Sequence, residues 1–399
     1  MSTTSTLSLS STSSSLSLWD DSQPPKNGKV VKVHTKESYD SWTSSQSGES
    51  LSILQNMKLE NFSAGQISSL SPSEIHLCGV ERLGSLVKLS GECEGGLCLD
   101  MSSLTEVETD GQKLCHHVLK FLLDSYKFDA YKGCTADDDD DGGGGGGEGS
   151  GGGGDSEENR GRNRPKNDHP PSISLPISLF TEESIAEITN AADSVYLVRD
   201  LINRNAGTYD AFSDSSNHVD PKELQLAVER LGSVFKGSTR TTIGNDLLNK
   251  DNSKQWGKMN AFGAGCIHAV GQGVVEDNYQ PRLMDYFAGD VPESDDSNQS
   301  ALPLVTLVGK GVTFDTGGLS MKTPAGMLRM KKDMGGAAHV IGLANMILND
   351  KVNPLPIRLR VLIPAVENVV GPNSFRPGDV IRSVNGVTVE VGNTDAEGR

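Results

Sequence analysis

The sequence has little of several features that would each point to a class of protein. Aromatic residues make up 5% of the 399 residues and hydrophobic residues 35%. No apolar run approaches the roughly 18 residues that a membrane-spanning helix needs. Positive charge is also scarce, since 36 Lys and Arg face 53 Asp and Glu, a net charge of -17. This balance argues against nucleic acid or an anionic membrane as the main partner.

Cysteine is sparse and unevenly placed. Five of the six cysteines fall within residues 78–134, and none forms a Cys-x-x-Cys pair. A zinc site can be drawn from five neighbours in this region, but their spacing fits no compact zinc finger. They are Cys93, Cys98, Cys115, His116 and His117. We interpret the cysteines as reduced, mostly buried thiols of a cytosolic protein.

The shortage of apolar residues is local. The first fifty residues are rich in Ser and Thr, and residues 137–168 contain an Asp run, a glycine tract and a short basic cluster. Neither stretch can bury enough apolar surface to offset the entropy lost on ordering. We therefore predict a disordered tail over 1–50 and a disordered acidic, Gly-rich insertion over 135–168. Between and after them lie an N-terminal α/β domain over 51–134 and a larger domain over 169–399.

The N-terminus carries no clear targeting signal. Residues 1–19 are acid-poor and Ser-rich, as organelle transit peptides are, but they contain no Arg or Lys, and their Leu-Ser alternation is not a secretory core. We expect a cytoplasmic protein, with a plastid or mitochondrial location as the alternative.

Apolar periodicity predicts alternating helices and strands, which is typical of an α/β fold. Helices are expected over 111–125, 182–203, 222–235 and 335–349. Strands are expected over 302–308 and 357–363, giving a strand–helix–strand unit. Asn385-Gly386, between strands at 380–384 and 387–391, is a strong hairpin signal.

Charged residues interrupt the otherwise apolar, Gly-rich second half. Lys310, Asp315, Lys322 and Asp333 form one set; Asp395, Glu397 and Arg399 follow just after the predicted hairpin. Four carboxylates in one pocket repel each other unless a cation lies between them. Ligation rich in carboxylates and free of Cys suits Zn²⁺, Mn²⁺ or Mg²⁺ in a catalytic site.

Each of these residues also has an ordinary interpretation. Lys310 lies beside glycines as a phosphate-binding lysine does, but the G-x-x-x-x-G-K-[ST] motif is absent. Asp333 precedes a predicted helix and is a candidate N-cap. Asp395 and Glu397, taken alone, are typical of a solvated loop. His268 and His339 are isolated among apolar residues and are interpreted as core or surface residues.

Three segments together carry a resemblance: residues 308–322 (VGKGVTFDTGGLSMK), residues 330–338 (MKKDMGGAA) and residues 393–399 (NTDAEGR), hereafter the signature segment. Their combined pattern closely resembles the leucine (cytosol) aminopeptidase family. The resemblance is dense over 300–399 and weaker over 170–300. It implies a catalytic domain over 169–399 with a central mixed sheet flanked by helices. It also implies removal of N-terminal residues from peptides, two divalent cations, and assembly as a hexamer.

The resemblance also implies roles for seven residues. Asp315, Asp395 and Glu397 would hold one metal; Lys310, Asp333 and the bridging Asp315 and Glu397 would hold the other. Lys322 would stabilise the oxyanion, and Arg399 would hold a bicarbonate that shuttles a proton. The alternative function is a catalytically impaired homologue that serves as an assembly or scaffold subunit. Members of the family continue past the signature segment, so we expect an incomplete catalytic domain that is poorly soluble and weakly active when expressed alone.

Overall fold

The computed structural model describes residues 15–19, 29–34, 74–78, 97–103, 111–126, 172–207, 218–249, 263–288 and 302–399. The predicted acidic insertion over 135–168 lies outside the described residues, as do Cys93 and most of the predicted tail over 1–50. Within the part that is described, no helix has both the length and the apolar character needed to cross a membrane.

The N-terminal part of the chain forms a five-stranded sheet in which every neighbouring pair of strands is parallel. Its order is β1 (Ser15–Trp19), β5 (Ser172–Pro176), β4 (Leu97–Ser103), β2 (Lys29–His34) and β3 (Glu74–Cys78). Helix α5 (Gly111–Ser125) packs against it, with the bounds that the sequence predicts. The first core contains Leu99, Leu114, Phe121, Ile173 and Leu175, all fully buried.

Two of these strands lie where a disordered tail is predicted, so the prediction is wrong for Ser15–Trp19 and Lys29–His34. Alternation of Leu and Ser has the period of two that gives a strand one apolar face. Leu16 packs against the first core, while the hydroxyl of exposed Ser17 lies 2.8 Å from that of Ser174. Pairing with β5, more than 150 residues away, therefore supplies the burial that the tail lacks by itself.

The second sheet is mixed, which confirms the predicted fold class. Its order is β6 (Gly237–Ile243), β7 (Arg282–Ala288), β10 (Arg358–Asn368) and β8 (Leu304–Val308), and β9 (Gly311–Asp315) also pairs with β10. The pairs β6–β7 and β7–β10 are antiparallel, whereas β8 and β9 run parallel to β10. Strands β8 and β9 follow each other along one side of β10. The residues that link them and those that follow β9 therefore lie near the same part of the sheet.

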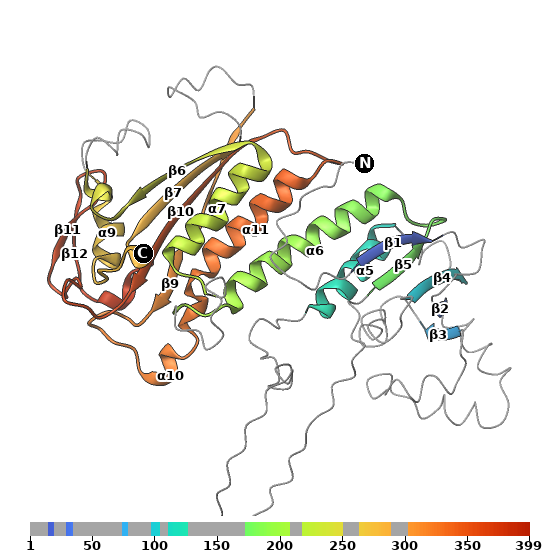
Figure 1. The fold of residues 1–399 in the computed structure, drawn as a ribbon, viewed down its shortest axis with the longest axis horizontal. Helices are drawn as coiled ribbons and strands as arrows, with labels where there is room; N and C mark the ends of the chain where they lie inside the picture. The colour runs from blue at the N-terminus through green and yellow to red at the C-terminus, as the bar shows by residue number, and fades with distance from the viewer. Residues whose placement is uncertain are drawn as a thin grey trace, which may run out of the picture.

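Three helices lie side by side over one face of this sheet: α6 (Glu182–Asn203), α7 (Pro221–Phe235) and α11 (Gly335–Asn349) (Figure 1). Their bounds match the predicted helices within one residue. Thr181 and Asp220 cap α6 and α7 by accepting hydrogen bonds from the backbone of Ser184 and Glu223. The second core lies beneath them; its fully buried members include Leu231, Met284, Tyr286, Ile341 and Val361.

Helix α6 belongs to both cores. Ile188 and Ala192 are buried in the first core, and Leu197 and Leu201 in the second. Figure 1 shows α6 running from the three-helix layer to the N-terminal sheet, where it meets α5. The hydroxyl of Tyr126, just after α5, donates a hydrogen bond of 2.7 Å to Asp200 on α6. A single helix thus joins the two sheets.

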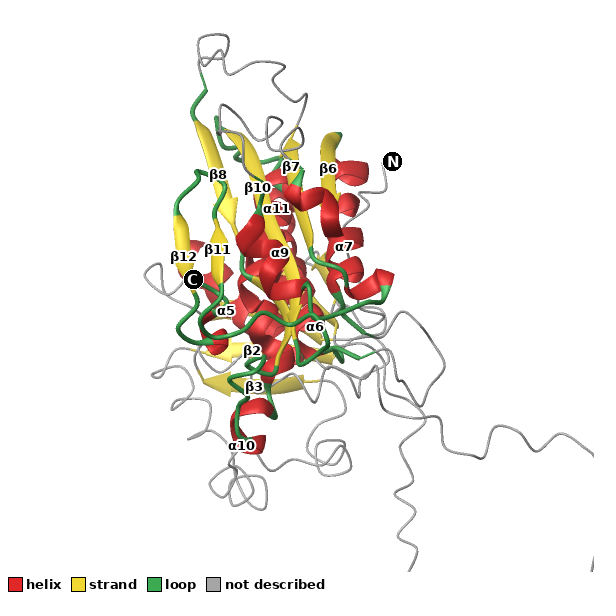
Figure 2. Cartoon of the chain, turned by 90° about the vertical axis from the view of Figure 1, so that its left-hand side faces the viewer, coloured by secondary structure: helices red, strands yellow, loops and turns green. Residues whose placement is uncertain are grey.

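The other face of the mixed sheet carries α9 (Gly265–Gly271), which lies in front of β10 in Figure 2. Beside α9 is the predicted hairpin, formed by β11 (Val380–Arg382) and β12 (Thr388–Glu390). Its turn contains Gly386 at φ +87°, a left-handed conformation that suits glycine. Val391, just after β12, packs with Ala269 and Phe375. This buried contact anchors the chain directly before the signature segment.

Candidate metal centre

The predicted charged residues come from four short segments that meet at the carboxyl ends of β9 and β10. Lys310 links β8 to β9, Asp315 ends β9, and Lys322 lies in the following loop. Asp333 lies in the 3-10 helix η7 (Met330–Met334), which packs against β9. The signature segment supplies the others: Asp395 lies in the 3-10 helix η8 (Thr394–Ala396), and Glu397 follows it. Ligand sites of α/β sheets commonly form at such strand ends.

Two lysines and four carboxylates converge there. Lys310 Nζ lies 2.7 Å from Glu397 Oε1 and 2.8 Å from Asp333 Oδ2. Lys322 Nζ lies 2.8 Å from Asp315 Oδ2 and also contacts Asp395 Oδ1. One oxygen each from Asp315, Asp395 and Glu397 lie within 4.8 Å of one another. The structure therefore brings together the six acidic and lysine residues that the sequence singles out.

The charges and burial of this cluster suit divalent cations. The side chains of Asp315 and Glu397 are 4% and 3% exposed. Four carboxylates against two ammonium groups leave two negative charges, and burying these without a partner is costly. The oxygens of Asp315, Asp395 and Glu397 are close enough for one cation; Lys310, Asp333 and Glu397 form an adjoining group. The donor set fits the hard to borderline cations predicted for it.

Both lysines are held in the charged form by their neighbours. Burial lowers the pKa of Lys310, but hydrogen bonds and charges from Asp333 and Glu397 outweigh it, and the net shift is upward. Burial opposes the charge of Lys322 in the same way, and Asp315 and Asp395 raise its pKa well above the usual range. To become a ligand, Lys310 must lose this proton, which a cation beside it would enforce.

Glycines shape the loop that returns Lys322 to Asp315. Gly317 and Gly318 have φ values of +87° and +61°, which other residues rarely adopt. A Cβ atom at Gly317 would lie 2.6 Å from the carbonyl oxygen of Ser320. The backbone N–H of Lys322 donates to the carbonyl of Thr316 at 2.9 Å and closes the loop. The Gly-rich sequence is therefore required by the turn.

The structure also shows polar residues that the sequence analysis missed. Asn368, the last residue of β10, is fully buried and donates to Asp315 Oδ1 at 2.9 Å. Thr394 is also fully buried, and its hydroxyl donates to the carbonyl of Gly317 at 2.6 Å. An amide that ends an apolar strand beside the strand of Asp315 is a signal that could have identified Asn368.

The structure disagrees with two of the ordinary interpretations, the N-cap role of Asp333 and the phosphate-binding role of Lys310, and agrees with the one given for the histidines. Asp333 does not cap α11, whose N-cap position is Met334 without a side-chain hydrogen bond. Lys310 is held by carboxylates, which disfavours a phosphate partner. His339 is exposed and bonds the carbonyl of Gly335, and His268 lies 3.0 Å from Asn245 Oδ1. These contacts agree with a structural or surface role for both histidines.

Arg399 is exposed, and its backbone N–H donates to the carbonyl of Ala396 at 3.4 Å.

Of the cysteines, Cys115 is a free, partly buried thiol, and burial is the main cause of its raised pKa. Cys266 is free and exposed, contrary to the expectation of mostly buried thiols.

Glu367, next to Asn368 on β10, should make stability depend on pH. Burial, with the charges of Asp220 and Glu276, raises the pKa of Glu367 from 4.5 to about 7. A carboxyl group whose pKa is raised in the folded state favours folding below pH 4.5, and this contribution is lost as the pH rises through about 7. Glu367→Gln should therefore raise the free energy of unfolding at pH 8 by up to about 3 kcal/mol, with little change near pH 5.

Urea denaturation at pH 5 and pH 8 measures this difference. The exposed Glu390, replaced by Gln, is the control and should shift both values equally. If Glu367→Gln and the wild type kept the same pH dependence, the carboxyl would not be desolvated in the folded protein.

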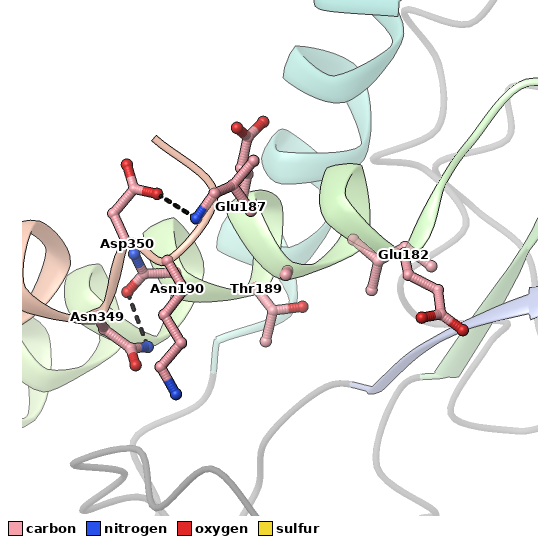
Figure 3. A pocket seen from close by; sticks show the side chains of 10 residues that line it. Glu182, Glu187, Thr189, Asn190, Asn349 and Asp350 are labelled. Carbon is pink, nitrogen blue, oxygen red and sulfur yellow. Dashed lines mark hydrogen bonds between the residues drawn. The ribbon is translucent and has the colours of Figure 1, made fainter. Parts of the chain in front are cut away.

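A separate hollow of about 250 Å³ lies away from the charged cluster, between the first half of α6 and the end of α11 (Figure 3). Glu182, Glu187, Asn190, Asn349 and Asp350 are among its lining residues. Asn349 donates to Asn190 Oδ1 at 3.1 Å, so two of the lining residues join the two helices. None of the predicted site residues lines this hollow.

Comparisons with known proteins agree with the sequence resemblance. Residues 210–399 match the family model described as cytosol aminopeptidase family, catalytic domain. A probable cytosol aminopeptidase of Xylella fastidiosa is 47% identical over 142 residues, which are 36% of this chain and 26% of that protein. One of Chlamydia abortus is 36% identical over 218 residues, which are 55% of this chain and 36% of that protein.

Solved structures share the fold. The cytosol aminopeptidase of Coxiella burnetii is 28% identical, with a TM-score of 0.62 over 94% of this chain and 66% of that chain. The bottromycin maturation enzyme BotP in complex with Mn has a TM-score of 0.58 at 21% identity, which shows the fold alone. The matches thus span about a quarter to a third of the two curated relatives and about two thirds of these solved chains.

Proposed function

Because the chain belongs, through residues 210–399, to the cytosol aminopeptidase family, we propose that the protein hydrolyses the N-terminal residue from peptides with two divalent cations. The observation that carries this proposal is the convergence of Lys310, Lys322 and four carboxylates at the ends of β9 and β10. Carboxylates gathered at this density suit a two-metal hydrolytic site.

The two groups of donors suggest the distribution of the cations. Asp315, Asp395 and Glu397, whose oxygens lie within 4.8 Å of one another, would hold one ion. Lys310 and Asp333, which meet Glu397 on the other side, would hold the second together with Asp315 and Glu397. When bound, the pair of ions would lower the pKa of a water molecule and polarise the scissile carbonyl.

Two residues of the chain would act on charge that develops during the reaction. Lys322 keeps its proton and would donate a hydrogen bond from Nζ to the oxygen of the scissile carbonyl as that oxygen becomes negative. Arg399, at the exposed end of the signature segment, would hold a bicarbonate ion that accepts and returns a proton. Both roles come from the family pattern at these positions.

The finer properties are part of the same proposal. We expect a preference for leucine-type N-terminal residues, Zn²⁺ or Mn²⁺ as the working ions with Mg²⁺ as an alternative, a cytoplasmic location, and assembly as a hexamer. Mn²⁺ is the first ion to test, because the similar fold of BotP is described in complex with Mn. The alternative, a scaffold subunit without activity, has no observation in its favour, since all seven charged positions are present.

Hydrolysis of leucyl-p-nitroanilide by the purified protein tests the function. We expect release of nitroaniline, weak when residues 1–399 are expressed alone, that depends on added Mn²⁺ and stops with EDTA. N-acetyl-leucyl-p-nitroanilide is the matched control, because an aminopeptidase needs a free amine and should leave it intact. A folded protein that binds Mn²⁺ but hydrolyses neither substrate would favour the scaffold alternative.

A further inference from the structure

Asn368 lies where β10, β9 and the signature segment meet. The register of β9 on β10 pairs Val312 with Val366 but Asp315 with Asn368, so β9 has one extra residue over this stretch. Such a bulge changes the direction of the side chains that follow it. Here it sets the last residue of β9 opposite the last residue of β10.

The amide of Asn368 uses both of its hydrogens. Nδ2 donates to Asp315 Oδ1 at 2.9 Å and to the carbonyl oxygen of Thr394 at 3.0 Å. A flipped amide would place Oδ1 against these two acceptors, so the partners fix the orientation of the side chain. In this orientation Oδ1 faces Gly318, where a Cβ atom would lie 2.8 Å away. Asn368 thus ties Asp315 to the residue that precedes Asp395.

The two oxygens of Asp315 consequently have different surroundings. Oδ1 accepts from Asn368 and also from the backbone N–H of Gly317 at 2.9 Å. Oδ2 faces Lys322 Nζ at 2.8 Å, on the side of the charged cluster. With Oδ1 occupied by two donors, Oδ2 is the atom of Asp315 that can meet a cation.

Thr394 holds the same arrangement from the other side. Its hydroxyl donates to the carbonyl of Gly317 and accepts from the backbone N–H of Ser320 at 2.7 Å. The loop after β9 and the signature segment are therefore joined at several points, all buried or partly buried. Asn368 donates to a carboxylate of the cluster through its side chain, whereas Gly317 does so through its backbone N–H.

We infer that Asn368 is a positioning residue that makes Asp315 a one-atom ligand through Oδ2 and fixes its separation from Asp395. The inference rests on the proposed metal-dependent function. It assigns no metal contact to Asn368 itself. Residues that orient a metal ligand by a hydrogen bond on the side away from the metal affect metal affinity strongly, typically by about 10- to 100-fold.

The test is the affinity of the purified protein for Mn²⁺, measured by isothermal titration calorimetry. Asn368→Leu removes both hydrogen bonds at similar volume and should weaken Mn²⁺ binding by about 10- to 100-fold. Asn345→Leu is the matched control. Asn345 is also a buried amide, donates to Ser194 and has an Oδ1 atom without a partner among the described residues, but it lies ten residues into α11. Its replacement should leave the Mn²⁺ affinity within about twofold.

A second measurement distinguishes the loss of Asp315 orientation from a nonspecific loss of order in the site. Without Asn368, Asp315 Oδ1 keeps the hydrogen bond from Gly317 but has a lone pair free to act as a second ligand atom, an arrangement that Ca²⁺ accepts readily. The preference of Asn368→Leu for Mn²⁺ over Ca²⁺ should therefore shrink by about tenfold, while that of Asn345→Leu stays unchanged. If the leucine variant does not fold, Asn368→Ala removes the same bonds without filling the space and should show the same losses.

The outcomes distinguish failure of the positioning role of Asn368 from failure of the proposed metal-dependent function. Wild-type Mn²⁺ affinity and wild-type selectivity in a folded Asn368 variant would overturn the positioning role and leave the proposed function intact. Absence of Mn²⁺ binding by the folded wild-type protein would overturn the proposed function and this inference with it.

Discussion

Replacing Asp315 by Asn should lower kcat/KM for leucyl-p-nitroanilide by at least about 1,000-fold, a loss of about 4 kcal/mol of transition-state stabilisation. Asp315 is buried, and its Oδ2 faces the centre of the charged cluster. In the variant, one of the two carboxylate oxygens of residue 315 becomes an NH₂ group, which repels a cation, and the negative charge is lost. Since both proposed ion sites include Asp315, both should be affected, and metal content measured by atomic absorption should fall with the activity.

Asp350→Asn is the control for this variant. Asp350 follows α11, is partly buried away from the charged cluster, and accepts backbone hydrogen bonds from Val352 and Asn353, which an Asn side chain can also accept. Activity and metal content should remain near those of the wild type. An Asp315→Asn protein that kept its full metal content would show that the cations are held elsewhere.

Replacing Lys322 by Ala should reduce kcat by about 100- to 1,000-fold while the protein keeps its metal. The proposed role of Lys322 is to stabilise negative charge on the carbonyl oxygen. It contributes no donor atom to either ion site. Its ammonium group contacts Asp315 and Asp395, so its removal also takes away a positive charge that competes with a cation. The Mn²⁺ affinity should therefore be unchanged or higher, as calorimetry can measure.

Lys331→Ala controls for the loss of a partly buried lysine near the site. Lys331 donates from Nζ to the carbonyl of Asn203 on α6 at 2.6 Å and contacts none of the four carboxylates in the described structure. Its replacement should leave kcat within a few fold. Equal loss of metal from Lys322→Ala and Asp315→Asn would mean that the roles of these two residues are wrongly assigned.

Local sequence signals predicted the helices well, because each has both an apolar face and a defined start. Helix α6 begins at the predicted residue after its cap Thr181, α7 begins one residue before the predicted start after its cap Asp220, and α11 spans the predicted residues 335–349. The sequence also singled out the charged cluster, because charges in Gly-rich, apolar surroundings need partners. These features depend on residues close together in the chain or on the chemistry of single side chains.

Features that depend on distant pairing were missed. Strand β1 pairs with β5, and nothing within residues 1–50 indicates that partner. Asn368 meets Asp315 because of an extra residue in β9, and a bulge of this kind leaves no periodic trace in the sequence. The resemblance placed Lys322 and Asp395 in one site, but their direct contact depends on the fold, which brings together residues 73 apart in the chain.

Helix α6 has a consequence for how the molecule comes apart. Because Ile188 and Ala192 face one core and Leu197 and Leu201 the other, loss of either core would remove one of the two sets of contacts that keep this helix in place. Neither sheet can therefore melt without weakening its neighbour. Denaturation should follow one cooperative transition for both parts, in contrast to the independent melting of modules joined only by a linker.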